Sequence, residues 1–204
     1  MRFNKRKVIY LISPLKIDNT FYHHLKCVLK QKKVSFFQLR LKKENIKKKI
    51  KIGKKIKKIC KKNKVKFIIN DDPYLALKLK ADGCHLGQND MSIDNARKIL
   101  KNKIIGVTCH NSLKLAKEAA LNKANYIAIG AFYSSTTKKV VHKATITTLK
   151  KIKKSIKIPV VAIGGINKKN YKNLLLNKTD FLAISGYVWN NKKFEPDQAI
   201  KILK

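Results

Sequence analysis

Residues 104–131, IIGVTCHNSLKLAKEAALNKANYIAIGA, contain two short apolar runs on either side of one helical pattern. The first run, Ile104–Thr108, opens with an unbroken apolar stretch, which is typical of a strand buried on both faces. The helical pattern covers Leu113–Leu121, and Tyr126–Ala131 is the second apolar run. A strand, a helix and a strand in this order predict a parallel β–α–β unit.

The same alternation extends over the whole chain. Strands are predicted at Val8–Ile12, Ser35–Leu39, Phe67–Asn70, Gly83–Leu86, Ile104–Thr108, Tyr126–Ala131, Pro159–Ile163 and Asp180–Ser185. Helices are predicted at Phe21–Gln31, Glu44–Lys62, Pro73–Leu79, Ile93–Leu100, Leu113–Leu121, Thr145–Lys154, Lys168–Leu176 and Pro196–Leu203. An open doubly wound sheet usually has fewer strands and a glycine-rich first turn, whereas the first strand here ends Ile12-Ser13-Pro14. We therefore predict an α/β protein with a single compact (β/α)8 TIM barrel that spans residues 1–204 as one domain.

The composition excludes several classes of protein. Hydrophobic residues make up 44% of the chain, which is typical of a globular protein and argues against disorder. No apolar run approaches the roughly 18 residues of a membrane span, and we expect Val8–Ile12 to be a strand rather than part of a signal peptide. The cysteines at 27, 60, 84 and 109 lack C-x-x-C spacing, which favours a cytoplasmic protein without a zinc site.

The formal charge of +38 comes mainly from lysines that are spread over the whole length. In the densest block, Lys42–Lys66, lysines alternate with Ile46, Ile50, Ile52 and Ile56, as in an amphipathic helix with a solvated basic face. A nucleic-acid footprint is the alternative interpretation. We expect incidental binding of polyanions rather than a dedicated site for them.

Polar side chains follow the second predicted strand. In barrels of this type, catalytic groups lie at the carboxyl ends of the strands. Gln38, Arg40 and Lys42 alternate at such an end, and Arg40 is one of only four arginines in the chain. An amide and two cations suit a phosphate or a diphosphate, although ordinary polarity at a helix start would give the same pattern.

The acidic residues are scarce and clustered. Asp71 ends the third predicted strand and Asp90 follows the fourth. Two carboxylates on neighbouring strand ends can share one hard cation, for which magnesium is the natural candidate. The alternative is that such residues cap helices or make turns, which we expect of Asp94. We expect His85 to be a structural histidine rather than a ligand.

The remaining strand ends carry hydroxyl groups and glycines. Cys109 and His110 end the fifth strand, but adjacent residues point to opposite faces, so we do not expect a Cys–His nucleophile. Ser134–Lys138 follows the sixth strand, where hydroxyl groups beside a lysine suit a phosphate ester, unless the segment is simply a flexible loop. Gly164-Gly165 follows the seventh strand and Ser185-Gly186 stands at the end of the eighth, where barrels commonly hold a phosphate on backbone N–H groups.

Together these strand ends resemble the thiamine phosphate synthase family, over a length from Val8 to about Tyr187. The motifs that carry the resemblance are Gln38–Lys42, Asn70-Asp71, Ala81–Asp90, Gly106–His110, Ser135–Lys138, Val161–Ile166 and Ile184-Ser185. Their order on successive strands is far more specific than any one of them.

The resemblance implies a Mg²⁺-dependent transferase that joins a hydroxymethylpyrimidine diphosphate to a hydroxyethylthiazole phosphate. In the family, the bond to diphosphate largely breaks first, and the thiazole nitrogen captures the resulting pyrimidine carbocation. By resemblance, Arg40, Lys42 and Lys138 are catalytic and Asp71 and Asp90 bind Mg²⁺. The pyrimidine diphosphate would be held by Gln38, Leu39, Arg40, Leu41, Lys42, Asn70, Thr108 and Lys138. The thiazole phosphate would be held by Ser135, Thr136, Thr137, Gly165, Ile184 and Ser185.

The chain departs from the family pattern at several positions. Asp72 stands where arginine is usual, and Thr108 stands where serine is usual. Ala131 replaces the usual proline and Ser135 the usual first threonine, and Lys139–Lys143 lacks the customary proline and glycine.

Two alternatives remain at this stage. The first is a thiazole tautomerase-like branch of the same barrel, which need not bind diphosphate. The second is a non-catalytic barrel that binds anions or RNA. The synthase is favoured because one chain combines Gln38, Arg40, Lys42, Asp71, Asp90 and Lys138.

Overall fold

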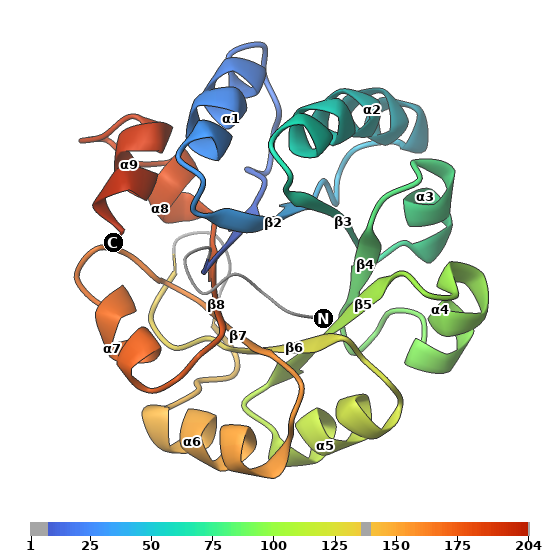
Figure 1. The fold of residues 1–204 in the computed structure, drawn as a ribbon, viewed down its shortest axis with the longest axis vertical. Helices are drawn as coiled ribbons and strands as arrows, with labels where there is room; N and C mark the ends of the chain where they lie inside the picture. The colour runs from blue at the N-terminus through green and yellow to red at the C-terminus, as the bar shows by residue number, and fades with distance from the viewer. Residues whose placement is uncertain (1–7, 136–139, 204) are drawn as a thin grey trace.

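The computed structural model describes residues 8–135 and 140–203. These residues form a closed barrel of eight parallel strands, in which β8 also pairs with β1 (Figure 1). The strands are β1 (Ile9–Ile12), β2 (Val34–Leu39), β3 (Lys66–Asn70), β4 (Gly83–Leu86), β5 (Ile104–His110), β6 (Tyr126–Gly130), β7 (Val160–Ile163) and β8 (Phe181–Ile184). The predicted (β/α)8 barrel is confirmed.

Helices surround the barrel on its outside (Figure 1). They are α1 (Phe21–Lys30), α2 (Ile46–Lys62), α3 (Pro73–Lys78), α4 (Ile93–Leu100), α5 (Leu113–Leu121), α6 (Ile146–Ser155), α7 (Tyr171–Leu176), α8 (Gly186–Trp189) and α9 (Pro196–Ile202). All were predicted except α8, a single turn that directly follows β8. None of the helices in the described residues has the length and hydropathy that a membrane crossing requires.

Strand alternation sorts the apolar side chains into two separate clusters. One cluster fills the interior of the barrel and is dominated by the rings of Tyr10, Phe36, Tyr126 and Phe181. Phe36 stacks on Tyr10 at 5.3 Å between ring centroids and meets Phe181 edge to face at 5.1 Å. The larger cluster lies between the barrel and the helices. Within the described residues the interior is therefore a packed core, and a ligand is expected at an end of the barrel rather than inside it.

The lysine-rich helix α2 packs as its sequence predicts. Ile52, Ile56 and Cys60 are buried, while most of its lysines are exposed. Ile46 is half exposed and does not belong to the buried stripe. Gly53 leaves room for the side chain of Leu79, the residue after α3, because a Cβ atom at Gly53 would lie 2.5 Å from Cδ1 of Leu79. The solvated basic face predicted for this segment is confirmed.

At the amino ends of the strands, polar side chains link neighbouring strands of the barrel. Asp82, Asn125 and Asp180 directly precede β4, β6 and β8, and each accepts a hydrogen bond from a backbone N–H group of the preceding strand. The donors, at 2.9, 2.8 and 2.7 Å respectively, are Phe67, Ile105 and Val160. These side chains replace water as the acceptor at strand starts that the helix layer covers.

We predict that Asp180→Ala lowers the free energy of unfolding by about 2 kcal/mol, because the buried N–H of Val160 loses its acceptor. Asp180→Asn keeps an acceptor oxygen and should lose less. Urea unfolding measures both, with Glu118→Ala, an exposed residue of α5, as the control. Equal losses for the alanine and asparagine variants would contradict the assigned cause.

Candidate active site

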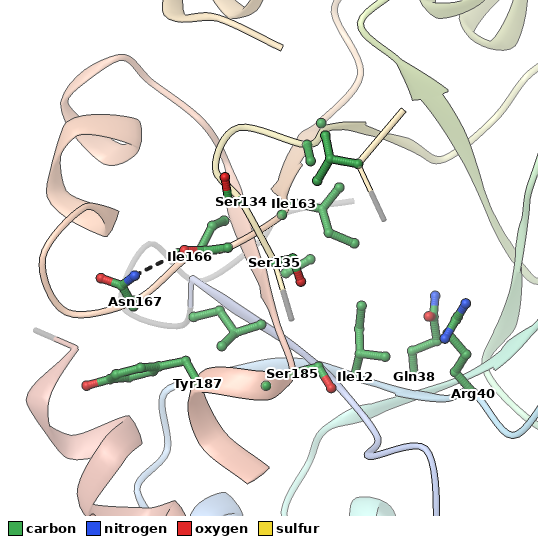
Figure 2. Close-up of a pocket in the computed structure, with 18 of the residues that line it drawn as sticks. Ile12, Gln38, Arg40, Ser134, Ser135, Ile163, Ile166, Asn167, Ser185 and Tyr187 are labelled. Carbon is green, nitrogen blue, oxygen red and sulfur yellow. Dashed lines mark hydrogen bonds between the residues drawn. The ribbon is translucent and has the colours of Figure 1, made fainter. Parts of the chain in front are cut away.

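A cavity of about 590 Å³ opens at the carboxyl ends of the strands. Figure 2 shows Gln38 and Arg40 at one side of it and Asn167 and Tyr187 at the other. The predicted site residues that line it are Gln38, Arg40, Asn70, Thr108, Ser135, Gly165, Ile184 and Ser185. The predicted residues around this one cavity thus lie in or directly after β2, β3, β5 and β8, and in the loops after β6 and β7. Thr136, Thr137 and Lys138 lie outside the described residues.

The charge of the cavity wall is one-sided. Among its described residues there is no carboxylate, whereas Arg40 and Lys192 carry positive charge. Ser13 helps to fix Arg40, because its hydroxyl accepts a hydrogen bond from the Arg40 backbone N–H at 2.9 Å. A concave wall with cations and no acid favours anionic ligands.

A chain of buried hydrogen bonds crosses the barrel below the cavity. Nε2 of Gln38 donates to the Tyr10 hydroxyl at 3.0 Å, and the hydroxyl groups of Tyr10 and Tyr126 are 2.7 Å apart. The chain continues from the Tyr126 hydroxyl to Nδ1 of His85 at 3.0 Å and from Nε2 of His85 to the Thr108 hydroxyl at 2.8 Å. Both ring nitrogens of His85 have partners, so the structural role predicted for this histidine is confirmed.

The side chains of this hydrogen-bonded network are neutral at physiological pH. Burial lowers the pKa of His85 to about 4, with Arg40 adding to the effect and Asp71 opposing it. Burial also raises the pKa values of Tyr10 and Tyr126. Gln38 and Thr108, which line the cavity, are therefore held in place by a network that carries no charge.

Lys42 does not share the main cavity with Gln38 and Arg40. It lines a smaller hollow of about 180 Å³ and forms an ion pair with Asp71, at 2.9 Å between Nζ and Oδ2. Strand β2 ends at Leu39, so strict alternation stops before Lys42. Leu39 and Leu41 bury their side chains in the outer apolar cluster. Both leucines also line the smaller hollow.

Asp71 and Asp90 lie together beside this hollow. Asp71 has a φ of 65°, and its backbone N–H donates to the carbonyl of His85 at 2.8 Å, which ties it to β4. Oδ2 of Asp90 accepts from the backbone N–H of Gly87 at 2.6 Å. Burial raises the pKa of Asp90, and a hydrogen bond to the Asp71 side chain raises it further.

This pair of carboxylates fits Mg²⁺. The two groups approach each other closely enough to share a proton, and a divalent cation would relieve the same repulsion. The described residues contain no cluster of three or more histidine, cysteine or acidic side chains suited to a metal ion. Two carboxylates suffice for Mg²⁺, which usually keeps waters and takes substrate phosphate oxygens as further ligands.

The end of β5 separates its cysteine from its histidine. Cys109 is buried in the outer cluster, and burial raises its pKa to about 12. His110 lines the cavity, where the centroid of its ring lies 4.3 Å from that of the His142 ring. A Cys–His nucleophile was not expected, and this geometry agrees with that expectation.

Two of the clustered acids have roles at helix starts. Oδ1 of Asp72 accepts from the backbone N–H of Leu75 at 2.9 Å and so caps α3. Asp94 was expected to cap a helix, and this prediction is wrong. Ser92 caps α4, and Asp94 lies in the first turn of that helix.

Sequence reasoning missed several residues of the cavity wall. Ser13, His142, Asn167 and Lys192 lie in loops outside the motifs that were singled out. Their loops carry no periodic pattern, and α8 is too short to show one. Of these residues, only Ser13 was predictable, because it directly follows a strand, where site residues of a barrel are expected.

The fold and the cavity define a (β/α)8-barrel protein with a site for anionic ligands. The chain matches the family model for thiamine monophosphate synthase over residues 9–188, and it belongs to that family of enzymes.

Known relatives agree with this assignment. The chain is 64% identical to thiamine-phosphate synthase of Pelagibacter ubique over 207 residues, which covers all of both chains. It is 40% identical to the Erythrobacter litoralis synthase over 196 residues, covering 94% of this chain and 92% of the other. The solved structure of thiamine phosphate pyrophosphorylase from Pyrococcus furiosus matches with a TM-score of 0.86 and 30% identity, covering 98% of this chain and 95% of the other.

The lowered pKa of His85 predicts a specific loss of stability in acid. An unfolded histidine binds a proton below about pH 6.5, whereas folded His85 stays neutral until about pH 4. Stability should therefore fall as the pH drops through this window, by about 2 kcal/mol between pH 7 and pH 5 from this residue alone. Urea unfolding of wild type and His85→Gln at both pH values isolates the contribution. An identical pH dependence in the two proteins would contradict it.

Proposed function

We propose that this chain is a Mg²⁺-dependent thiamine phosphate synthase. It would join 4-amino-2-methyl-5-hydroxymethylpyrimidine diphosphate to 4-methyl-5-(2-hydroxyethyl)thiazole phosphate, or to its carboxylated form, and release diphosphate. The observation that carries the proposal is one cavity that is lined by Gln38, Arg40 and Asn70, with the Asp71–Asp90 pair next to Asn70, and also by the turn of Gly164 and Gly165. That arrangement offers separate places for two phosphorylated substrates.

The β2–β4 side would bind the pyrimidine diphosphate. Arg40 and Lys42 would neutralise the negative charge that develops on the leaving diphosphate, with Lys138 as a further cation by family resemblance. Asp71 and Asp90 would hold Mg²⁺, which supplies additional positive charge to the diphosphate oxygens when bound. Gln38, Asn70 and Thr108 would orient the substrate through hydrogen bonds.

The reaction requires one bond to break and one to form. The carbon–oxygen electron pair leaves with diphosphate, and the thiazole nitrogen supplies the pair for the new carbon–nitrogen bond. The apolar wall formed by Ile12, Ile163 and Ile184 would exclude water, which would otherwise capture the cation. Neutral His85 is not required to transfer a proton.

The β6–β8 side would bind the thiazole phosphate through Ser135, Gly165, Ile184 and Ser185. The hydroxyl of Ser185 donates to the carbonyl of Ser13 at 3.2 Å, which holds the two loops together. Thr136 and Thr137 are assigned to the same substrate by family resemblance.

The free cysteines, three of them buried, support our further proposal of a cytoplasmic location.

A product assay tests the proposal directly. Purified protein is mixed with both phosphorylated precursors, with and without Mg²⁺, and thiamine phosphate is followed by mass. We expect Mg²⁺-dependent product. Folded protein that makes none would contradict the proposal, and the thiazole carboxylate phosphate would then test the tautomerase alternative.

We predict that Asp90→Asn lowers kcat by a factor on the order of 100 or more, because one of two carboxylates for Mg²⁺ is lost. Thermal unfolding should show that the variant is folded. Asp94→Asn, in the first turn of α4, is the matched control and should retain activity. Full activity in Asp90→Asn would refute the metal assignment.

A polyanion-binding barrel makes a different prediction. Its affinity for RNA would fall steeply with salt and would not respond to substitution of Asp71 or Asp90. The same purified variants distinguish this alternative from the synthase.

A further inference from the structure

The turn after β7 packs directly against the loop after β6. Gly164 has a φ of 103° and Gly165 a φ of 61°, backbone angles that residues other than glycine rarely adopt. A Cβ atom at Gly165 would lie 2.2 Å from the carbonyl oxygen of Ser134, and one at Gly164 would lie 2.3 Å from Cβ of Ala131. The turn therefore has a fixed path along one wall of the cavity.

Both glycine carbonyl groups are held by hydrogen bonds. The oxygen of Gly164 accepts from the backbone N–H of Tyr133 at 3.1 Å. The oxygen of Gly165 accepts from Nδ2 of Asn170 at 3.0 Å. It also accepts from Nδ2 of Asn167 at 3.2 Å, the bond that is dashed in Figure 2.

Holding these oxygens also fixes two N–H groups. A trans peptide is planar, and its N–H points opposite to its C=O. The held carbonyl of Gly164 therefore sets the direction of the Gly165 N–H, and the held carbonyl of Gly165 sets that of the Ile166 N–H. Within the described residues, no hydrogen bond has either of these N–H groups as its donor. Gly165 and Ile166 both line the cavity, so both donors are available to an anion there.

The two asparagines are themselves held in place. Oδ1 of Asn170 accepts from the backbone N–H of Asn167 at 2.9 Å, and Oδ1 of Asn167 accepts from that of Lys169 at 2.8 Å. The Tyr133 hydroxyl donates to the carbonyl of Asn170 at 3.4 Å. Each asparagine thus uses its oxygen to fix its orientation and its nitrogen to hold Gly165. An aspartate could accept in the same way but could not donate.

We propose that Asn167 and Asn170 are positioning residues for the phosphate monoester of the thiazole substrate. They act through Gly165, by directing the N–H groups of Gly165 and Ile166 toward the phosphate. This proposal rests on the proposed function only for the identity of the ligand.

The test compares a phosphorylated with an unphosphorylated ligand. Calorimetry measures binding of the thiazole phosphate and of the corresponding thiazole alcohol to wild type, Asn170→Ala and Asn170→Asp. We expect both variants to bind the phosphate about tenfold more weakly, because the charge-assisted hydrogen bonds lose their alignment. Binding of the alcohol should not change. Asn177→Ala, at the end of α7, is the control and should match wild type.

A purely structural role would give a different result. If the turn simply deforms, both ligands should lose affinity equally, and the proposal is wrong. An unchanged affinity for the phosphate, or a wild type that does not bind it, would overturn the proposal as well. Wild type that binds the phosphate but yields no thiamine phosphate would refute the proposed function and leave this inference standing. In steady-state assays, Asn170→Ala should raise KM for the thiazole phosphate and leave KM for the pyrimidine diphosphate unchanged.

Discussion

Closure of the parallel strands into a barrel is the constraint on which the rest of the structure depends. Once the last strand pairs with the first, each strand residue must face either the interior or the helices, with a period of two. Phe36 therefore fills the interior, and Gln38, two residues further on, reaches the floor of the cavity. The hydrogen-bonded chain from Gln38 to Thr108 follows from the same rule, because polar groups so deeply buried need partners.

Strand alternation also decides how far the sequence predicts the site. It places Gln38 at the end of β2 and brings Arg40 to the same cavity, whereas Lys42, beyond the end of the strand, lines the neighbouring hollow beside Asp71. The strands and helices were predictable because their apolar periodicity is strong. The four-residue helix α8 and the roles of Asn167 and Asn170 were not, because they depend on contacts between loops that no local pattern encodes.

The arrangement of charge explains how one cavity could serve two anions. Arg40, Lys42 and the Asp71–Asp90 pair lie at the β2–β4 side, whereas the glycine turn after β7 offers uncharged donors. In the reaction that we propose, the two phosphorylated groups stay apart while a carbon and a nitrogen meet between them. A neutral floor suits this arrangement, since a charged His85 or an ionised tyrosine would alter the field at the reacting carbon.

Anomalous scattering from crystals soaked with Mn²⁺ and the pyrimidine diphosphate tests the central claim most directly, because Mn²⁺ binds the same oxygen ligands as Mg²⁺. We predict one strong peak in contact with the carboxylates of Asp71 and Asp90 and with the diphosphate, with Arg40 and Lys42 on the same diphosphate. A diphosphate bound instead at the turn of Gly164 and Gly165, with no metal peak at the two aspartates, would contradict the division of the cavity.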